Sequence, residues 1–189
     1  GVYATCFWDY NDPATGEDIA AMKEETGARI DEAKAETSRE IQAMKATFLT
    51  ELRTAGVIVD DAAQAALGDG LEFFAALDDP RARNAINMLN SAPPQGVLAR
   101  FAAITADYVQ RHDDGEAAAA WRALGAFAFP IDAGRAVDAY EKARDADPDD
   151  AYTHYRLSVL YRDKARLDEA MASARTAEAL GRAAGEIGV

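Results

Sequence analysis

The strongest constraint on how this chain folds is a stretch from Glu17 to about Ala55 that holds no proline and one glycine, Gly27. Apolar or small residues recur along it at spacings of three, four and four, which is a repeat of eleven residues. Eleven residues make close to three turns of an α-helix, so the pattern predicts one long helix with a nearly straight apolar stripe. We assign to this stripe, as an oligomerisation surface, Ile19, Met22, Ile30, Ala33, Ile41, Met44, Phe48 and Leu52.

Two interpretations of the stripe stay open at the level of sequence. Either the helix pairs with a second copy as a coiled coil, or it folds back on the rest of its own domain. Thr26, Ala33 and Thr37 give the middle of the stripe little apolar area, so we expect only modest stability from such a pair alone. Phe48 and Leu52 predict a buried C-terminal end of the helix in both cases.

The composition of the whole chain favours an all-α fold. Alanine recurs in tracts rich in Glu, Arg and Leu, which have high helix propensity, and the β-branched clusters that strands need are scarce. Hydrophobic residues make up 49% of the chain and charged residues 28%, a balance typical of globular domains. Turn and cap residues then predict a helix from Asp60 to about Leu77, with a kink at Gly68 and Gly70. They predict a second helix that begins at Asp79-Pro80 and is ended by Pro93-Pro94. A third helix is expected from about Gln95 to Gln110, followed by a loop at 112–115.

Charge and composition argue against several classes of function. The net charge of -13 repels a phosphate backbone, so we expect no nucleic-acid partner. One cysteine, Cys6, and two histidines far apart in sequence, His112 and His154, predict neither a metal site nor a cofactor. Acidic pairs such as Asp149-Asp150 fall at expected helix starts, where carboxylates cap the helix, so we expect no catalytic carboxylates and no enzymatic activity.

The start of the chain, residues 1–16, is an apolar and aromatic stub. It suits either a short tail that packs on the domain or the outer end of a membrane helix upstream, because Trp8 and Tyr10 are typical of a membrane interface. No run in the chain approaches the roughly 20 apolar residues that a spanning helix needs. We therefore expect the chain as given to be soluble, and either cytoplasmic or tethered to a membrane by an upstream helix.

The last third of the chain contains an internal repeat. A first copy consists of Trp121, Leu124, Gly125, Ala136, Tyr140, Ala143 and Pro148, and a second of His154, Leu157, Ser158, Tyr161, Leu167, Asp168, Glu169, Ala170, Ala174 and Ala177. Small residues let two helices approach closely, and the leucines and aromatic residues fill the space beside them. The order of aromatic, Leu-Gly, Ala, aromatic, Ala and Pro resembles the tetratricopeptide repeat.

This resemblance covers about residues 117–183 and implies a right-handed array of helical hairpins that follows the long helix. Since about three repeats are needed for stability, we expect the helices from Pro80 to Gln110 to supply a degenerate one. The expected organisation is an N-terminal stub over 1–16, the long amphipathic helix over 17–56, a helical region with the degenerate repeat over 57–115, and two tetratricopeptide-like repeats with a C-terminal tail over 116–189.

The resemblance also implies a binding groove, because the first helix of each such hairpin lines a concave surface that holds a peptide or helix. Mapped by spacing, the groove residues are Arg122, Ala126, Phe129, Tyr152, Tyr155, Arg156, Val159 and Arg162. Tyrosine and arginine are enriched at binding hot spots, and an arginine cluster would select an acidic segment or a C-terminal carboxylate. The alternative is that Tyr155 is core and the arginines pair with Asp163 and Glu169.

These observations predict a bacterial-style scaffold or adaptor that binds a protein or peptide segment and has no catalysis of its own. The competing prediction is a structural self-assembly module, in which the long helix joins copies of the chain and the groove is filled by the chain's own N-terminal helices. An enzyme is the class that the sequence supports least.

Overall fold

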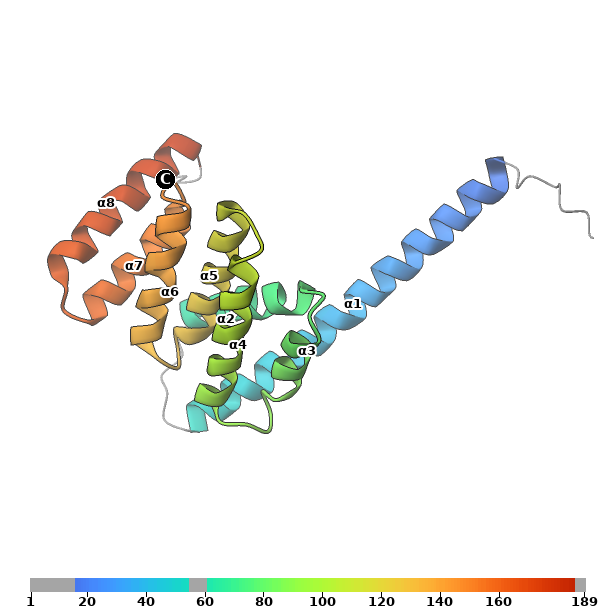
Figure 1. Ribbon diagram of the computed structural model, residues 1–189, viewed down its shortest axis with the longest axis horizontal. Coiled ribbons are helices and arrows are strands. Elements are labelled where there is room, and N and C mark those ends of the chain that lie inside the picture. Colours follow the sequence, from blue (N-terminus) through green and yellow to red (C-terminus); the bar gives the residue numbers. More distant parts are fainter. Residues whose placement is uncertain (1–15, 55–60, 186–189) are drawn as a thin grey trace, which may run out of the picture. The chain divides into compact units, whose positions relative to one another are not determined.

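The structure, a computed structural model, describes residues 16–54 and 61–185. Within these ranges every regular element is a helix, so the all-α prediction is confirmed. The helices are α1 (Gly16–Thr54), α2 (Asp61–Ala76), α3 (Pro80–Asn87), α4 (Pro94–Val109), α5 (Asp114–Ala128), α6 (Ala133–Ala146), α7 (Ala151–Asp163) and α8 (Leu167–Ala184) (Figure 1). The stub before Gly16, the expected helix stop at Gly56 and the expected cap at Asp60 lie outside the described residues.

The chain divides into two compact units, residues 1–40 and 41–189, and the apolar stripe of α1 runs through both. In the first unit, the side chains of Met22 and Ile30 are 65% and 49% exposed. In the second unit, Ile41, Phe48 and Leu52 are buried, and Met44 packs against the core. The C-terminal part of the stripe therefore folds onto its own domain, as one of the two interpretations expected. The side chains of Ile19 and Ala33 lie outside the described residues.

Aspartate caps fix where several helices of the second unit begin. α3, α5, α6 and α7 each follow an aspartate whose carboxylate accepts hydrogen bonds from backbone N–H groups of the first turn, namely Asp79, Asp113, Asp132 and Asp150. These bonds satisfy N–H groups that have no partner inside the helix. The capping role expected of the acidic pairs is confirmed for the pairs that contain Asp79, Asp113 and Asp150.

Two expected boundaries are wrong. Pro94 begins α4 and does not end the preceding helix, because proline fits the first helical position, where no N–H partner is needed; α3 already ends at Asn87. The expected loop at 112–115 overlaps the first turn of α5, which Asp113 caps. α2 is a single helix that includes Gly68 and Gly70, and the kink expected at these glycines stays a prediction.

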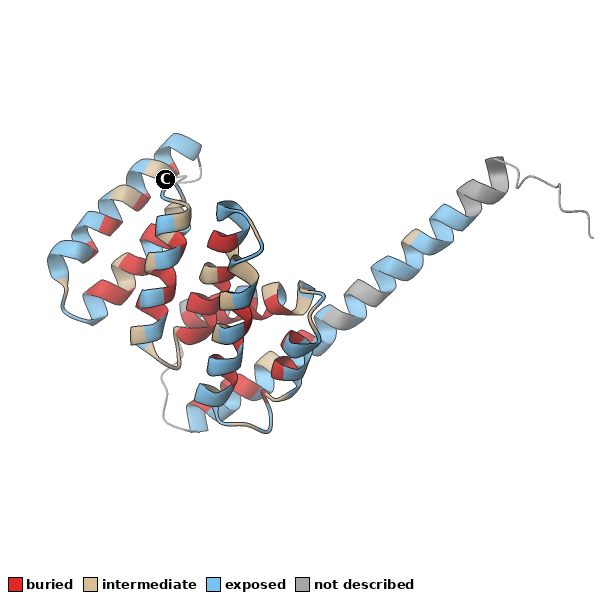
Figure 2. Ribbon diagram, in the orientation of Figure 1, coloured by how far each residue is buried: buried red, intermediate tan, exposed pale blue. Residues whose placement is uncertain are grey.

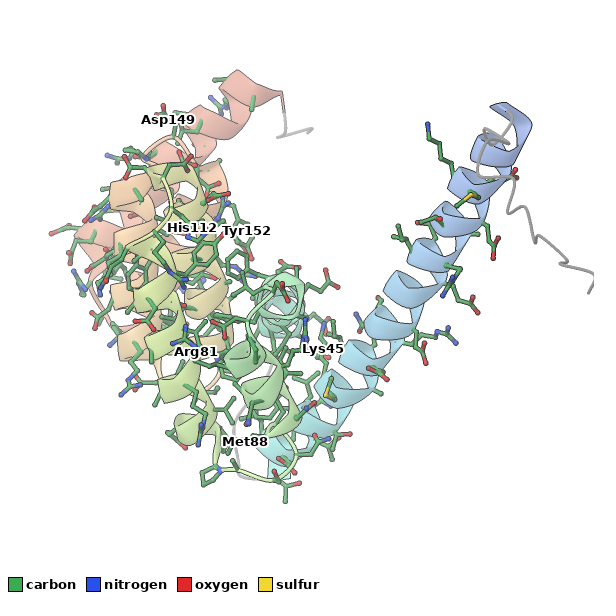
Figure 3. All side chains as sticks on the ribbon, turned by 45° about the vertical axis from the view of Figure 1, so that its right-hand side comes forward. Lys45, Arg81, Met88, His112, Asp149 and Tyr152 are labelled. Carbon is green, nitrogen blue, oxygen red and sulfur yellow. The ribbon has the colours of Figure 1, made fainter. Side chains whose placement is uncertain are left out.

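One of the two glycines of α2, Gly70, allows a close contact between helix backbones. A Cβ on Gly70 would lie 2.7 Å from the carbonyl oxygen of Ala123 and 3.2 Å from the amide nitrogen of Phe127, both backbone atoms of α5. A Cβ on Gly68 would meet the Lys45 side chain, which is labelled in Figure 3. Gly70 is therefore the position that lets α2 approach the backbone of α5.

A chain of aromatic rings forms the centre of the core of the second unit. Phe48 of α1 stacks on Phe127 of α5 with ring centroids 5.6 Å apart, and Phe101 of α4 meets Phe127 edge to face at 4.8 Å. Phe74 of α2 continues the chain by stacking on Phe101 at 4.1 Å. All four phenylalanines are fully buried, and Figure 2 shows buried segments on each of the helices α2, α4 and α5. Four helices thus share one continuous aromatic core.

The C-terminal helices form two closely packed pairs, α5 with α6 and α7 with α8, and α6 also packs on α7 (Figure 1). In the first pair, a Cβ on Gly125 would lie 2.8 Å from ring carbons of Tyr140, so the ring occupies the space that a side chain would take. Between the pairs, the Tyr161 hydroxyl donates to the Glu141 carboxylate at 2.7 Å. Burial, followed by this hydrogen bond, raises the pKa of Tyr161 to about 12, so the phenol stays a donor at neutral pH.

The contact between Gly125 and Tyr140 gives a first prediction. Gly125→Ala should lower the free energy of unfolding by about 1–3 kcal/mol, the range for overpacked cores, because the added methyl group clashes with a fully buried ring. Chemical denaturation followed by circular dichroism measures this change. Gly96→Ala is the matched control, since no atom lies within 4 Å of a Cβ there, and it should leave the free energy unchanged or raise it by up to about 1 kcal/mol. Equal effects of the two changes would contradict a tight helix contact at Gly125.

Candidate binding groove

A depression of about 310 Å³ lies where residues of α2, α5 and α7 meet. Its lining residues are Asp69 and Phe73 of α2, Ala119, Arg122, Ala123 and Ala126 of α5, and Tyr152 of α7. We call this depression the groove. Three alanines of α5 line it, so a ligand would come close to the α5 backbone, with Phe73 and Tyr152 offering aromatic surface.

The structure brings three of the eight expected groove residues together, Arg122, Ala126 and Tyr152. Arg156 is not exposed in the groove, because it is only 3% accessible. Its guanidinium lies over the rings of Phe129 and Tyr152, 5.5 and 5.0 Å from their centroids, and its Nε donates to the Tyr152 hydroxyl at 2.9 Å. Arg156 and Phe129 therefore support Tyr152, whose position is labelled in Figure 3.

The remaining expected residues lie elsewhere on α7. Tyr155 is 50% exposed and lines a second depression between α7 and α8, together with the small residues Ala174, Ala177 and Gly181. Arg162 pairs with Asp163 at 3.0 Å, as the alternative interpretation expected, while the exposure of Tyr155 contradicts its expected place in the core. Val159 is half-buried and lines neither depression.

The cationic charge of Arg122 is neutralised within the chain. One of its guanidinium nitrogens donates to the Asp150 carboxylate at 2.8 Å, and Asp150 also caps α7 by accepting from the backbone N–H groups of Tyr152 and Thr153. Burial raises the pKa of Asp150, but the hydrogen bonds from the Thr153 hydroxyl and from Arg122 outweigh it, so the pKa falls below its usual value. The arginine cluster expected to attract an acidic segment is therefore not assembled.

The α2 contribution to the groove, Asp69 and Phe73, was not expected from sequence. The degenerate repeat was expected over Pro80 to Gln110, so α2 lay outside the expected array. The available signal was Gly70, which lies between these two residues and marks a point of close helix contact. Asp69 adds a carboxylate to the lining, so the groove combines apolar surface, one neutralised arginine and an acidic side chain.

The two histidines of the chain have roles in packing. His154 is buried, and its Nε2 lies 2.9 Å from the carbonyl oxygen of Pro148, which accounts for it as a residue that fixes the turn before α7. His112 stacks on Tyr108 with ring centroids 3.6 Å apart (Figure 3). No group of three or more His, Cys, Asp or Glu side chains suited to a metal ion occurs in the described part of the chain. In the same ranges, none of the helices has the length and hydropathy needed to span a bilayer.

Comparisons of the chain with protein-family models, with curated proteins and with solved structures give no match. The groove is therefore interpreted from its own geometry and from the pattern of residues in the sequence.

The link between Arg122 and Asp150 gives a second prediction. Because the pKa of Asp150 is lowered on folding, its contribution to stability is present above the unfolded value of about 3.9 and is lost as the pH falls through the folded value. Asp150→Asn keeps a capping side chain but loses the ion pair. We expect this variant to unfold about 1 kcal/mol more easily at neutral pH, and to lose less stability than the wild type on acidification below about pH 4.

Urea denaturation across this pH range measures both effects. The control is Asp149→Asn, which removes the exposed neighbouring carboxylate and should leave the free energy of unfolding at neutral pH unchanged. Parallel pH profiles for the wild type and Asp150→Asn would show that the Asp150 carboxylate is not stabilised in the folded state.

Proposed function

We propose that this chain is a protein-interaction module, in which tetratricopeptide-like hairpins bind a segment of another protein in the groove between α2, α5 and α7. The observation that carries the proposal is the groove itself, where small residues of α5 are flanked by Phe73 and Tyr152. A depression in which small side chains lie between aromatic ones suits an extended peptide or one face of a helix.

The packing of the C-terminal helices supports the tetratricopeptide-like part of the proposal. Positions of the repeat signature that require small residues are buried in the helix pairs, among them Gly125, Ala136 and Ala143. Tyr140, the aromatic position of the first copy, is fully buried against Gly125. In the second copy, Leu157, Tyr161, Ala170 and Ala177 are buried as well.

The electrostatics of the groove favour a ligand with apolar side chains and at least one basic residue. The charge of Arg122 is already balanced by Asp150, and Arg156 is buried, so neither favours binding of a further carboxylate. Asp69 places negative charge in the groove lining, on a chain with a net charge of -13. A lysine or arginine of the ligand would meet Asp69, while its apolar neighbours would contact Phe73 and Tyr152.

The test is selection of binding peptides from a random displayed library on the intact chain, followed by affinity measurement. Ala119→Glu puts a carboxylate into the groove and should weaken binding of the selected peptides at least about tenfold, because apolar groups would have to desolvate the charge. Asp69→Lys should weaken peptides that contain lysine or arginine more than those that lack them.

The matched control is Ala172→Glu, the same change at an exposed position of α8 outside the groove lining, and it should leave binding unchanged. Circular dichroism would verify that all variants keep the helix content of the wild type. Peptides that bind Ala119→Glu as tightly as the wild type would place their site elsewhere and contradict the proposed function.

A further inference from the structure

We propose that residues 16–40 of α1 pair in parallel with the same residues of a second copy of this chain. This pairing involves only the first unit and does not depend on the groove. A pair of identical helices can be parallel or antiparallel.

The first observation is that the apolar stripe is buried in one unit and exposed in the other. Ile30 and Ile41 are eleven residues apart and so occupy the same position of the repeat. Ile41 is 6% exposed in the second unit, whereas Ile30 is 49% exposed in the first. Met22 and Met44 are related in the same way, with Met22 65% exposed and Met44 packed against the core. Along a stripe of constant register, the exposed residues thus belong to the first unit and the buried ones to the second.

The second observation is that the N-terminal part of α1 has little to hold it helical on its own. It contains Gly27, which costs about 1 kcal/mol relative to alanine in a helix interior, and a Cβ there would meet no atom within 4 Å beyond the helix's own nearby backbone. Most helical stability in proteins comes from packing of an apolar face. A second helix along Met22 and Ile30 would supply that packing.

The third observation is the charge on the two edges of the stripe. Lys23 lies along one edge, whereas Glu25 and Glu36, which are eleven residues apart, lie along the other. Glu40 adds to the acidic edge, and Arg29 interrupts it. The side chains of Lys23, Glu25 and Glu36 are exposed.

These edges distinguish the two orientations. In a parallel pair the edge on one side of the seam meets the opposite edge of the partner, so lysines lie against glutamates on both sides. In an antiparallel pair each edge meets its own kind, so lysines lie against lysines and glutamates against glutamates. Charge complementarity therefore favours the parallel arrangement with a second copy. The Thr26 hydroxyl bonds to the Met22 carbonyl of its own helix, so the seam centre adds little apolar contact and the association is weak.

Sedimentation analysis of the intact chain over a range of concentrations tests the proposal. We expect a reversible dimer, whose dissociation constant rises at least about tenfold for Ile30→Glu. The matched control is Ala28→Glu, which adds the same side chain at an exposed position away from the stripe and should have little effect. Gly27→Ala should tighten the dimer about fivefold by raising helix propensity. A chain that stays monomeric throughout, or equal effects of Ile30→Glu and Ala28→Glu, would overturn the proposal.

Orientation is tested by charge and by cross-linking. Lys23→Glu should weaken a parallel dimer about fivefold, and Arg39→Glu, the same charge reversal away from the stripe, should weaken it less. In a Cys6→Ser background, Met22→Cys should form an interchain disulfide on mild oxidation, because equivalent residues are adjacent only in the parallel register. Equal effects of the two charge reversals, or a dimer that forms no disulfide through Met22→Cys, would exclude the parallel arrangement.

Discussion

The arrangement of helices in the second unit depends on how closely the neighbouring helices pack against α5. Gly70 lets α2 approach the α5 backbone, and Gly125 of α5 leaves room for the ring of Tyr140 from α6. Phe127, on the same helix, joins the aromatic residues contributed by α1 and α4. Because interiors are packed as tightly as crystals, a methyl group added at either glycine has no empty space to occupy. The separations between helices are therefore set by the absence of side chains as much as by their presence.

The groove follows from these contacts. Asp69 lies next to Gly70, and Phe73 lies one turn of α2 further on, so the approach of α2 to α5 also brings both side chains to the groove. The α7 side depends on a polar link, since Arg122 of α5 holds Asp150, and Asp150 caps the helix that carries Tyr152. Residues that build the fold and residues available to a ligand are thus adjacent in sequence.

Much of the fold was predictable from sequence, because it depends on local signals. The caps at Asp79 and Asp150 depend on residues that are close to them in sequence. The long helix is indicated by the eleven-residue spacing of its own apolar residues. The groove was predictable only in part, since repeat spacing gives the face of a helix and not what covers it. Arg156 has the spacing of a groove residue, but it is buried, and its guanidinium lies over the rings of Phe129 and Tyr152. Asp69 and Phe73 reach the groove through a contact between distant helices, which periodicity within one helix cannot reveal.

The depression between α7 and α8 has a consequence for what can pack against it. Tyr155 lines this depression together with Ala174, Ala177 and Gly181, and Glu178 adds a carboxylate, so α7 and α8 present an uneven surface that is largely but not wholly apolar. In helical-hairpin arrays each unit touches only its neighbours, so stability is gained unit by unit along one direction. A helix packed against this face of α7 and α8 would cover apolar side chains without disturbing the aromatic core around Phe127. The face could therefore gain a binding partner with no rearrangement of the helices that are already folded.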